Sequence, residues 1–288
     1  MNTTSTVRKG PRHIWLCADD YGISPSVDEA IRALILRGRL NATSVMMAAP
    51  LLTAEEADNL EMLNSGKKRV AIGLHLTLTA PFEPMSAAFA PVRGGRFLPH
   101  PELMRAAMAR RLESERLVIE IATQLRAFAD AFGHLPDFLD GHQHVHLLPQ
   151  IRDAFLKVVA EAAPTAWVRH CGRARSGRRL RDRKALALDV LSLGFKRKAS
   201  RLGIATNSAF AGAYDFEGKT AFAKIFPRFL TGLPDGGLIM CHPGFVDAEL
   251  ERLDALTRQR EREFAYFNSD EFVHALASHS CALALPAS

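Results

Sequence analysis

The sequence of 288 residues has few cysteines and no long apolar run. Cys17, Cys171, Cys241 and Cys281 are scattered without a CxxC spacing, so we expect buried thiols and neither a disulfide framework nor a thiolate metal site. No uninterrupted stretch of about 18 apolar residues is present to form a membrane span. The N-terminal residues also lack the apolar core of a secretory signal, and we therefore expect a cytoplasmic protein.

Positive charge is concentrated in one segment of the chain. The formal net charge is +6, and residues 169–201 hold twelve Lys or Arg against Asp182 and Asp189. Such a segment could bind a phosphate-bearing substrate, a nucleic acid or an acidic partner. It lacks the interleaved aromatic side chains on which the bases of single strands stack. We therefore favour a solvated loop followed by a basic helix, and we do not expect nucleic acid to be the partner.

Short apolar runs alternate with longer amphipathic stretches along the chain. This alternation is typical of βαβ units and predicts an α/β fold built on a parallel sheet. Up to eight strands favour a closed or nearly closed (β/α) barrel, with an open doubly wound sheet as the alternative. The runs expected to form strands lie at 13–19, 43–49, 69–76, 136–140, 166–169, 203–206, 237–241 and 281–285.

Helix ends are also marked in the sequence. Ser24 is placed to cap a helix with Pro25 in its first turn, and Gly38 is placed to end that helix after Arg37. Between residues 101 and 132 apolar side chains recur at helical spacing.

Ionisable side chains follow five of the apolar runs. Because the active site of a barrel gathers at the carboxyl ends of its strands, these side chains are expected to meet. Taken singly, each has an ordinary explanation, such as a helix cap, a core histidine or a turn residue. Five strand ends of this kind are more than caps or chance would supply. The residues are Asp19 and Asp20, His75, Asp140 with His142, Arg169, and His242.

The stretch "DGHQHVH" at 140–146 places three histidines at every second position. If it is extended, the outer two lie about 13 Å apart at roughly 3.3 Å per residue, so they cannot share one ion. We expect one of them to be a metal ligand and the others to line a cleft, bind substrate or turn outward. One carboxylate and two histidines would leave coordination positions open for water and substrate, as in hydrolytic metal sites and in non-haem iron oxygenases. A spare carboxylate and a distant histidine favour hydrolysis.

Four motifs in series, "ADDYG", "GLHLTLT", "LDGHQHVHLLP" and "IMCHPGF", resemble those of the YdjC-like carbohydrate deacetylases, a group that includes chitooligosaccharide deacetylase and hopanoid-biosynthesis relatives. The resemblance covers residues 13–285 and leaves 1–12 as a flexible N-terminal segment. It implies a single-domain, distorted (β/α) TIM-like barrel that uses one divalent metal ion to remove acetyl groups from N-acetylated amino sugars.

The resemblance also implies roles for individual residues. Asp20, His75 and His142 would bind the metal, Asp19 would be the general base, His242 the general acid, and Arg169 would orient the base. A mixed nitrogen and oxygen site leaves magnesium and zinc open, although magnesium is less usual with two imidazoles. The residues expected to contact the substrate are Tyr21, Asp140, His144 and His146.

Two other functions remain open at this point. One is hydrolysis of another substrate class, phosphorylated or lipid-linked, which the basic segment would favour. The other is a metal-bearing binding protein without catalysis. The sequence also leaves open a homo-oligomer and the identity of the acetylated sugar.

Overall fold

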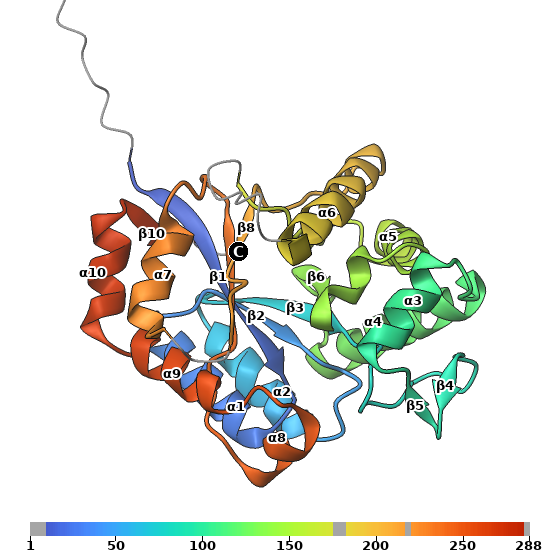
Figure 1. Cartoon of the computed structure of the whole chain (residues 1–288). Helices are drawn as coiled ribbons and strands as arrows, with labels where there is room; N and C mark the ends of the chain where they lie inside the picture. The colour runs from blue at the N-terminus through green and yellow to red at the C-terminus, as the bar shows by residue number, and fades with distance from the viewer. Residues whose placement is uncertain (1–9, 175–182, 217–219, 285–288) are drawn as a thin grey trace, which may run out of the picture.

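The computed structural model describes residues 10–174, 183–216 and 220–284, with backbone alone at 183–185 (Figure 1). Of the N-terminal segment expected to be flexible, 1–12, residues 1–9 lie outside the described residues, and Arg12 is the first residue of a β-strand. None of the helices in the described ranges combines the length and apolar character needed to cross a bilayer.

The centre of the molecule is a curled parallel sheet with the strand order β7-β6-β3-β2-β1-β9-β8, and β10 pairs with the first half of β1. Two isolated parallel bridges lie between the ends of this order: Val168 of β7 pairs with Thr206, which precedes β8, and Phe210 of β8 pairs with Arg173, which follows β7. The sheet therefore forms a distorted, nearly closed (β/α) barrel, which confirms the expected fold over the open sheet. The strands are β1 (Arg12–Tyr21), β2 (Ala42–Val45), β3 (Ala71–Leu76), β6 (Phe138–Gly141), β7 (Trp167–Val168), β8 (Phe210–Ala211), β9 (Leu238–Cys241) and β10 (Cys281–Leu283).

Seven of the eight expected strands are present, and one prediction was wrong. The run 203–206 contributes only the bridge at Thr206, and the strand of this region is β8, four residues further on. A short antiparallel hairpin of β4 (Val92–Arg93) and β5 (Arg96–Phe97) was not predicted.

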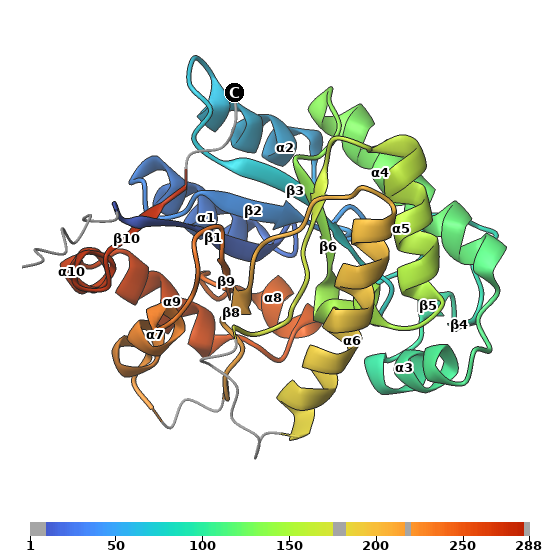
Figure 2. The ribbon, with the colours of Figure 1, turned by 90° about the horizontal axis from the view of Figure 1, so that it is seen from above.

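The helices cover the outside of the barrel, with α3 to α6 on one side of the central strands and α7, α9 and α10 on the other (Figure 2). Ser24 caps α1 by accepting a hydrogen bond from the Val27 amide, and Gly38 follows the helix with φ +65, as expected. The helical stretch 101–132 is two helices rather than one. The helices are α1 (Pro25–Leu36), α2 (Ala54–Glu61), η1 (Met62–Asn64), α3 (His100–Met108), α4 (Ser114–Phe132), η2 (His142–Leu147), α5 (Ile151–Ala162), α6 (Arg183–Arg201), α7 (Phe222–Leu230), α8 (Ala248–Leu253), α9 (Arg258–Phe267) and α10 (Asp270–Ser278).

Candidate active site

Three side chains from three strand ends meet at the carboxyl edge of the sheet. Asp20 comes from β1, His75 from β3, and His142 from the start of η2, directly after β6. Asp20 Oδ1 lies 2.9 Å from His142 Nδ1 and 3.3 Å from His75 Nε2. One ligand atom from each residue lies within 4.8 Å of the other two. The structure thus brings together the three residues expected to bind the metal.

The backbone of β1 explains why two consecutive carboxylates face different partners. Asp20 has φ 70, in the left-handed region, and the pairing of β1 with β2 shifts register between Ala18 and Tyr21. Such a bulge turns a side chain away from the direction that regular strand alternation would give it. Asp20 faces the two histidines, whereas Asp19 faces Arg169.

His75 is fixed in orientation by its second ring nitrogen. Its Nδ1 lies 2.6 Å from Asp140 Oδ1 and 3.0 Å from Ser44 Oγ, so the ring directs Nε2 toward Asp20. A carboxylate behind a histidine is the usual support of a metal-binding imidazole. Burial lowers the pKa of His75, but Asp140 and the neighbouring carboxylates outweigh it and raise the pKa to about 10. The same negative charge that favours a proton would favour a cation, so these residues fit a divalent metal.

Asp19 is held by a two-point ion pair. Arg169 Nη1 and Nη2 each lie 2.6 Å from an Asp19 oxygen, and Nη2 is also 2.5 Å from Asp140 Oδ2. Burial raises the pKa of Asp19, but the charge and hydrogen bonds of Arg169 outweigh it and hold the pKa well below its usual range. Cys17, Asp19 and Asp140 also form a compact group of potential ligand atoms, but the Arg169 guanidinium contacts all three. We therefore assign one metal position and not two.

His242 directly follows β9, which pairs with β1 on the side away from β2. Its backbone N–H donates to Glu263 Oε2 at 2.6 Å, and its ring packs edge-on to Phe216 with centroids 5.7 Å apart. Burial outweighs the opposing charges of Asp20 and Asp19, so the pKa of His242 lies below its ordinary value. Its buried Nδ1 has no hydrogen-bond partner among the described residues. The imidazole thus lies within the field of both carboxylates with one ring nitrogen unengaged.

Comparison with known proteins identifies the family. The model of the YdjC-like protein family matches residues 13–278 of this chain. The chain belongs to the YdjC-like family. Among curated relatives, the chitooligosaccharide deacetylase of Klebsiella pneumoniae (strain 342) is 30% identical and matches 80% of this chain and 81% of that protein. A carbohydrate deacetylase of Clostridium beijerinckii is 25% identical over 89% of this chain and 91% of its own.

Solved structures share the fold of this YdjC-like chain. A candidate cellobiose-phosphate cleavage protein from Enterococcus faecalis V583 superposes with a TM-score of 0.71 at 20% identity, covering 96% of this chain and 98% of that one. A peptidoglycan N-acetylglucosamine deacetylase gives a TM-score of 0.51 at 11% identity, covering 96% and 88%. Both similarities support the barrel architecture described above.

Three of the side chains expected to contact substrate in this YdjC-like protein are instead buried against other residues. The Tyr21 hydroxyl donates to the Glu56 carbonyl at 2.8 Å. Asp140 has no exposed surface and contacts His75 and Arg169. His146, also fully buried, has its Nε2 2.9 Å from the Arg169 carbonyl oxygen. In this arrangement all three side chains contact other protein groups, and their contact with substrate stays a prediction.

The extended interpretation of "DGHQHVH" was wrong. Residues 142–147 form η2, within which Gln143 and His144 have φ 53 and 58. The chain therefore turns sharply, and the three histidines have different surroundings. His142 faces Asp20, His144 is half-buried with its ring edge-on to Phe210, and His146 lies in the core. Burial, together with the charge of Arg169, lowers the pKa of His144 to about 3, so its ring is neutral.

Two functional candidates on α9 were missed from the sequence. Arg260, fully buried, has its Nη2 2.7 Å from Asp20 Oδ2 and 2.6 Å from Asp254 Oδ2. Glu263 accepts hydrogen bonds from the Tyr214 hydroxyl at 2.5 Å and from the His242 amide. Burial raises the pKa of Glu263 to about 7. The surrounding sequence "RQRERE" is typical of a solvated helix face, and it carries no signal for either role.

Proposed function

We propose that this protein is a divalent-metal-dependent hydrolase that removes the acetyl group from an N-acetylated amino sugar. The observation that carries the proposal is the convergence of Asp20, His75 and His142 beside Asp19, a carboxylate that has a separate cationic partner. The relatives named as chitooligosaccharide and carbohydrate deacetylases support the same reaction and substrate class. A cytoplasmic location and a homo-oligomer stay predictions.

Asp20, His75 and His142 would hold the metal ion, and the remaining coordination positions would face water and substrate. Zinc and magnesium both stay open, and the two imidazoles match the ligands of zinc better than those of magnesium. A bound divalent ion supplies polarisation of the amide carbonyl and lowers the pKa of a water molecule.

Asp19 is proposed as the base that accepts the proton of the attacking water. Arg169 keeps it ionised and fixes both of its oxygens, so it is ready to accept a proton without reorienting. The same ion pair weakens Asp19 as a base. It can therefore deprotonate only a water whose own pKa has been lowered, which links the base to the metal site.

His242 is proposed as the acid that protonates the leaving amine as the C–N bond breaks. Without this proton the amine would be expelled as an anion, and the tetrahedral species would return to the amide instead. The unengaged Nδ1 of His242 supports this role, and its lowered pKa makes the protonated imidazole a stronger acid toward the leaving amine. Each of the two proton transfers would contribute roughly 10²- to 10⁴-fold in rate.

Acetate release from N-acetylglucosamine and its oligosaccharides, with and without a chelator, tests the proposal. We expect release by the wild-type protein that the chelator abolishes, and release that is roughly 10²- to 10⁴-fold slower by Asp19→Asn. If a protein holding stoichiometric metal released acetate from none of these sugars, the proposal would fail for them. Phosphorylated and lipid-linked sugars would then be assayed next, and the non-catalytic binding protein after them.

A further inference from the structure

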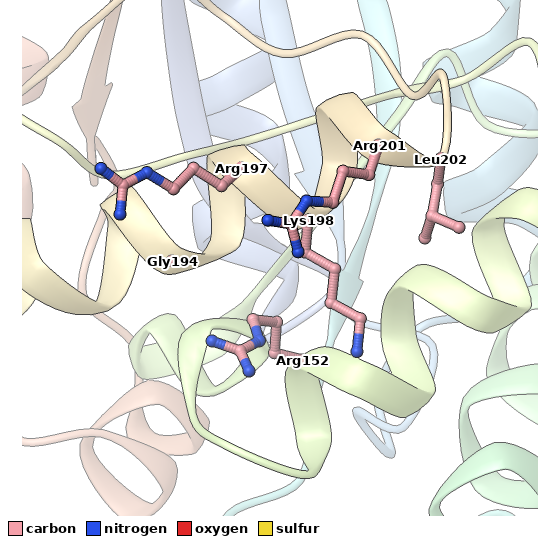
Figure 3. Close-up of a pocket in the computed structure, with 6 residues that line it drawn as sticks. All are labelled: Arg152, Gly194, Arg197, Lys198, Arg201 and Leu202. Atoms are coloured by element: carbon pink, nitrogen blue, oxygen red, sulfur yellow. The ribbon is translucent and has the colours of Figure 1, made fainter.

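A concave site lies on the outside of the barrel, between α5 and α6 (Figure 3). It has a volume of about 490 Å³, and we call it the outer basic pocket. In Figure 3, Lys198 extends from α6 toward α5, where Arg152 lies. The pocket shares no residue with the metal site or with Asp19 and His242. The lining residues are Arg152, Gly194, Arg197, Lys198, Arg201 and Leu202.

The cations of this pocket are not neutralised. Arg152 and Lys198 share one carboxylate, Asp153, at 3.1 and 2.6 Å. Arg197 and Arg201 form no ion pair with any residue in the described ranges. Four positive groups against one negative group leave a local charge of +3. Because like charges in a shared concavity repel one another, an anion bound there would relieve the repulsion.

One glycine is placed where it makes room for a cation of the pocket. A Cβ atom at Gly194 would lie 3.0 Å from Arg152 Nη1, closer than such contacts normally allow. Glycine in the middle of a helix is destabilising relative to alanine, yet it occupies the middle of α6 here. A methyl group at position 194 would require the Arg152 guanidinium to shift by a few tenths of an ångström.

We propose that the outer basic pocket binds a phosphate group, carried either by a soluble phosphorylated compound or by a lipid headgroup. Guanidinium groups present pairs of N–H donors that match two oxygens of a phosphate, and three arginines line this pocket. This places a phosphate-binding function within the basic segment 169–201, at its C-terminal end. Residues 175–182 of that segment lie outside the described residues, and Arg173 is paired with Asp189 at 2.9 Å.

Calorimetric titration with inorganic phosphate at constant ionic strength tests the site. We expect saturable binding by the wild-type protein and binding at least about tenfold weaker in Arg197→Gln/Arg201→Gln, because each lost charge-assisted contact should cost a large part of the affinity. Arg126→Gln/Arg258→Gln is the matched control, since it removes two exposed arginines from α4 and α9 and changes the net charge equally. Gly194→Ala keeps every charge but crowds Arg152, and we expect a smaller loss of affinity.

Absence of saturable phosphate binding by the wild-type protein would overturn the proposal. So would an equal loss in the control variant, which would indicate general electrostatic attraction in place of a site. Sedimentation with phosphatidylglycerol or phosphatidylcholine vesicles distinguishes the two sources. Binding to the anionic vesicles that soluble phosphate displaces, and that Arg197→Gln/Arg201→Gln loses, would assign a lipid headgroup. Phosphate binding without vesicle binding would assign a soluble compound, whereas vesicle binding that survives in the pocket variant would contradict the site.

Discussion

The arginines at the mouth of the barrel and those on the outer face of α6 differ in their partners. Arg169 and Arg260 are fully buried, and each contacts two carboxylates. Arg197 and Arg201 are exposed and have no carboxylate partner among the described residues. Burying a charge is costly unless it is paired, so the ion pairs of Arg169 and Arg260 must form as the protein folds. We call these ion pairs the inner network. The inner cations therefore position other protein groups, whereas the outer ones remain available to a ligand.

The strongest test of the inner network removes a proposed metal ligand. Asp20→Ala should lose both the metal ion and acetate release, by roughly 10³-fold or more, because a metal ion contributes several kcal/mol to such reactions. Metal content by mass spectrometry and initial rates of acetate release measure the two effects. Asp254→Asn is the matched control, because it alters the other carboxylate partner of Arg260 without removing a ligand. Stoichiometric metal in Asp20→Ala would refute the assigned site.

The neighbouring carboxylate should respond differently. Asp19→Asn should keep the metal ion but lower kcat by roughly 10²- to 10⁴-fold, because the amide cannot accept the proton of water. Metal content and kcat measured on the same preparation separate this effect from loss of the ion. If most of the activity survived, Asp19 would not be the base, and the proposal that Asp19 accepts the proton while Asp20 binds the metal would be wrong.

The convergence of Asp20, His75 and His142 could be predicted because its signal is local to each strand. Asp20 and His75 each end an apolar run, His142 directly follows one, and a parallel barrel brings such ends together. The surroundings of His144 and His146 could not be predicted in this way. Left-handed φ values at Gln143 and His144 turn the chain, and non-glycine residues adopt them uncommonly.

The supporting residues on α9 escaped prediction for a different reason. Arg260 and Glu263 lie in a helix whose sequence is mostly charged, and such a pattern normally indicates a solvated face. They are buried by contacts with residues that lie far from α9 in the sequence or outside the helix, namely Asp20, Asp254, Tyr214 and the backbone of His242. The spacing of residue types within α9 therefore gives no indication of these contacts.

The difference between the two kinds of arginine should also appear in stability. Arg169→Gln would leave Asp19 and Asp140 buried without their shared counter-charge and should lower the unfolding free energy by about 3–5 kcal/mol. Arg197→Gln, at an exposed position, should change it by less than about 0.5 kcal/mol. Urea denaturation of both variants measures the contrast. Equal effects would show that the inner ion pairs are no more essential to the fold than the outer charges.

The smallest expected effect concerns the pH dependence of stability that Glu263 imposes. Burial raises its pKa to about 7, from an ordinary value of 4.5 in the unfolded chain. Between these values the folded protein retains a proton that the unfolded chain has released, so this group's contribution should fall by about 1.4 kcal/mol per pH unit as the pH rises, and level off above pH 7.

Glu263→Gln should remove this slope, and urea denaturation between pH 5 and 8 would measure it as the difference from wild type. Glu251→Gln, at an exposed position on α8, is the control and should leave the wild-type slope in place. Parallel stability curves for wild type and Glu263→Gln would mean that Glu263 is ionised throughout. The buried groups around His242 would then include one more negative charge, which would balance the buried arginines more completely than a protonated Glu263 does.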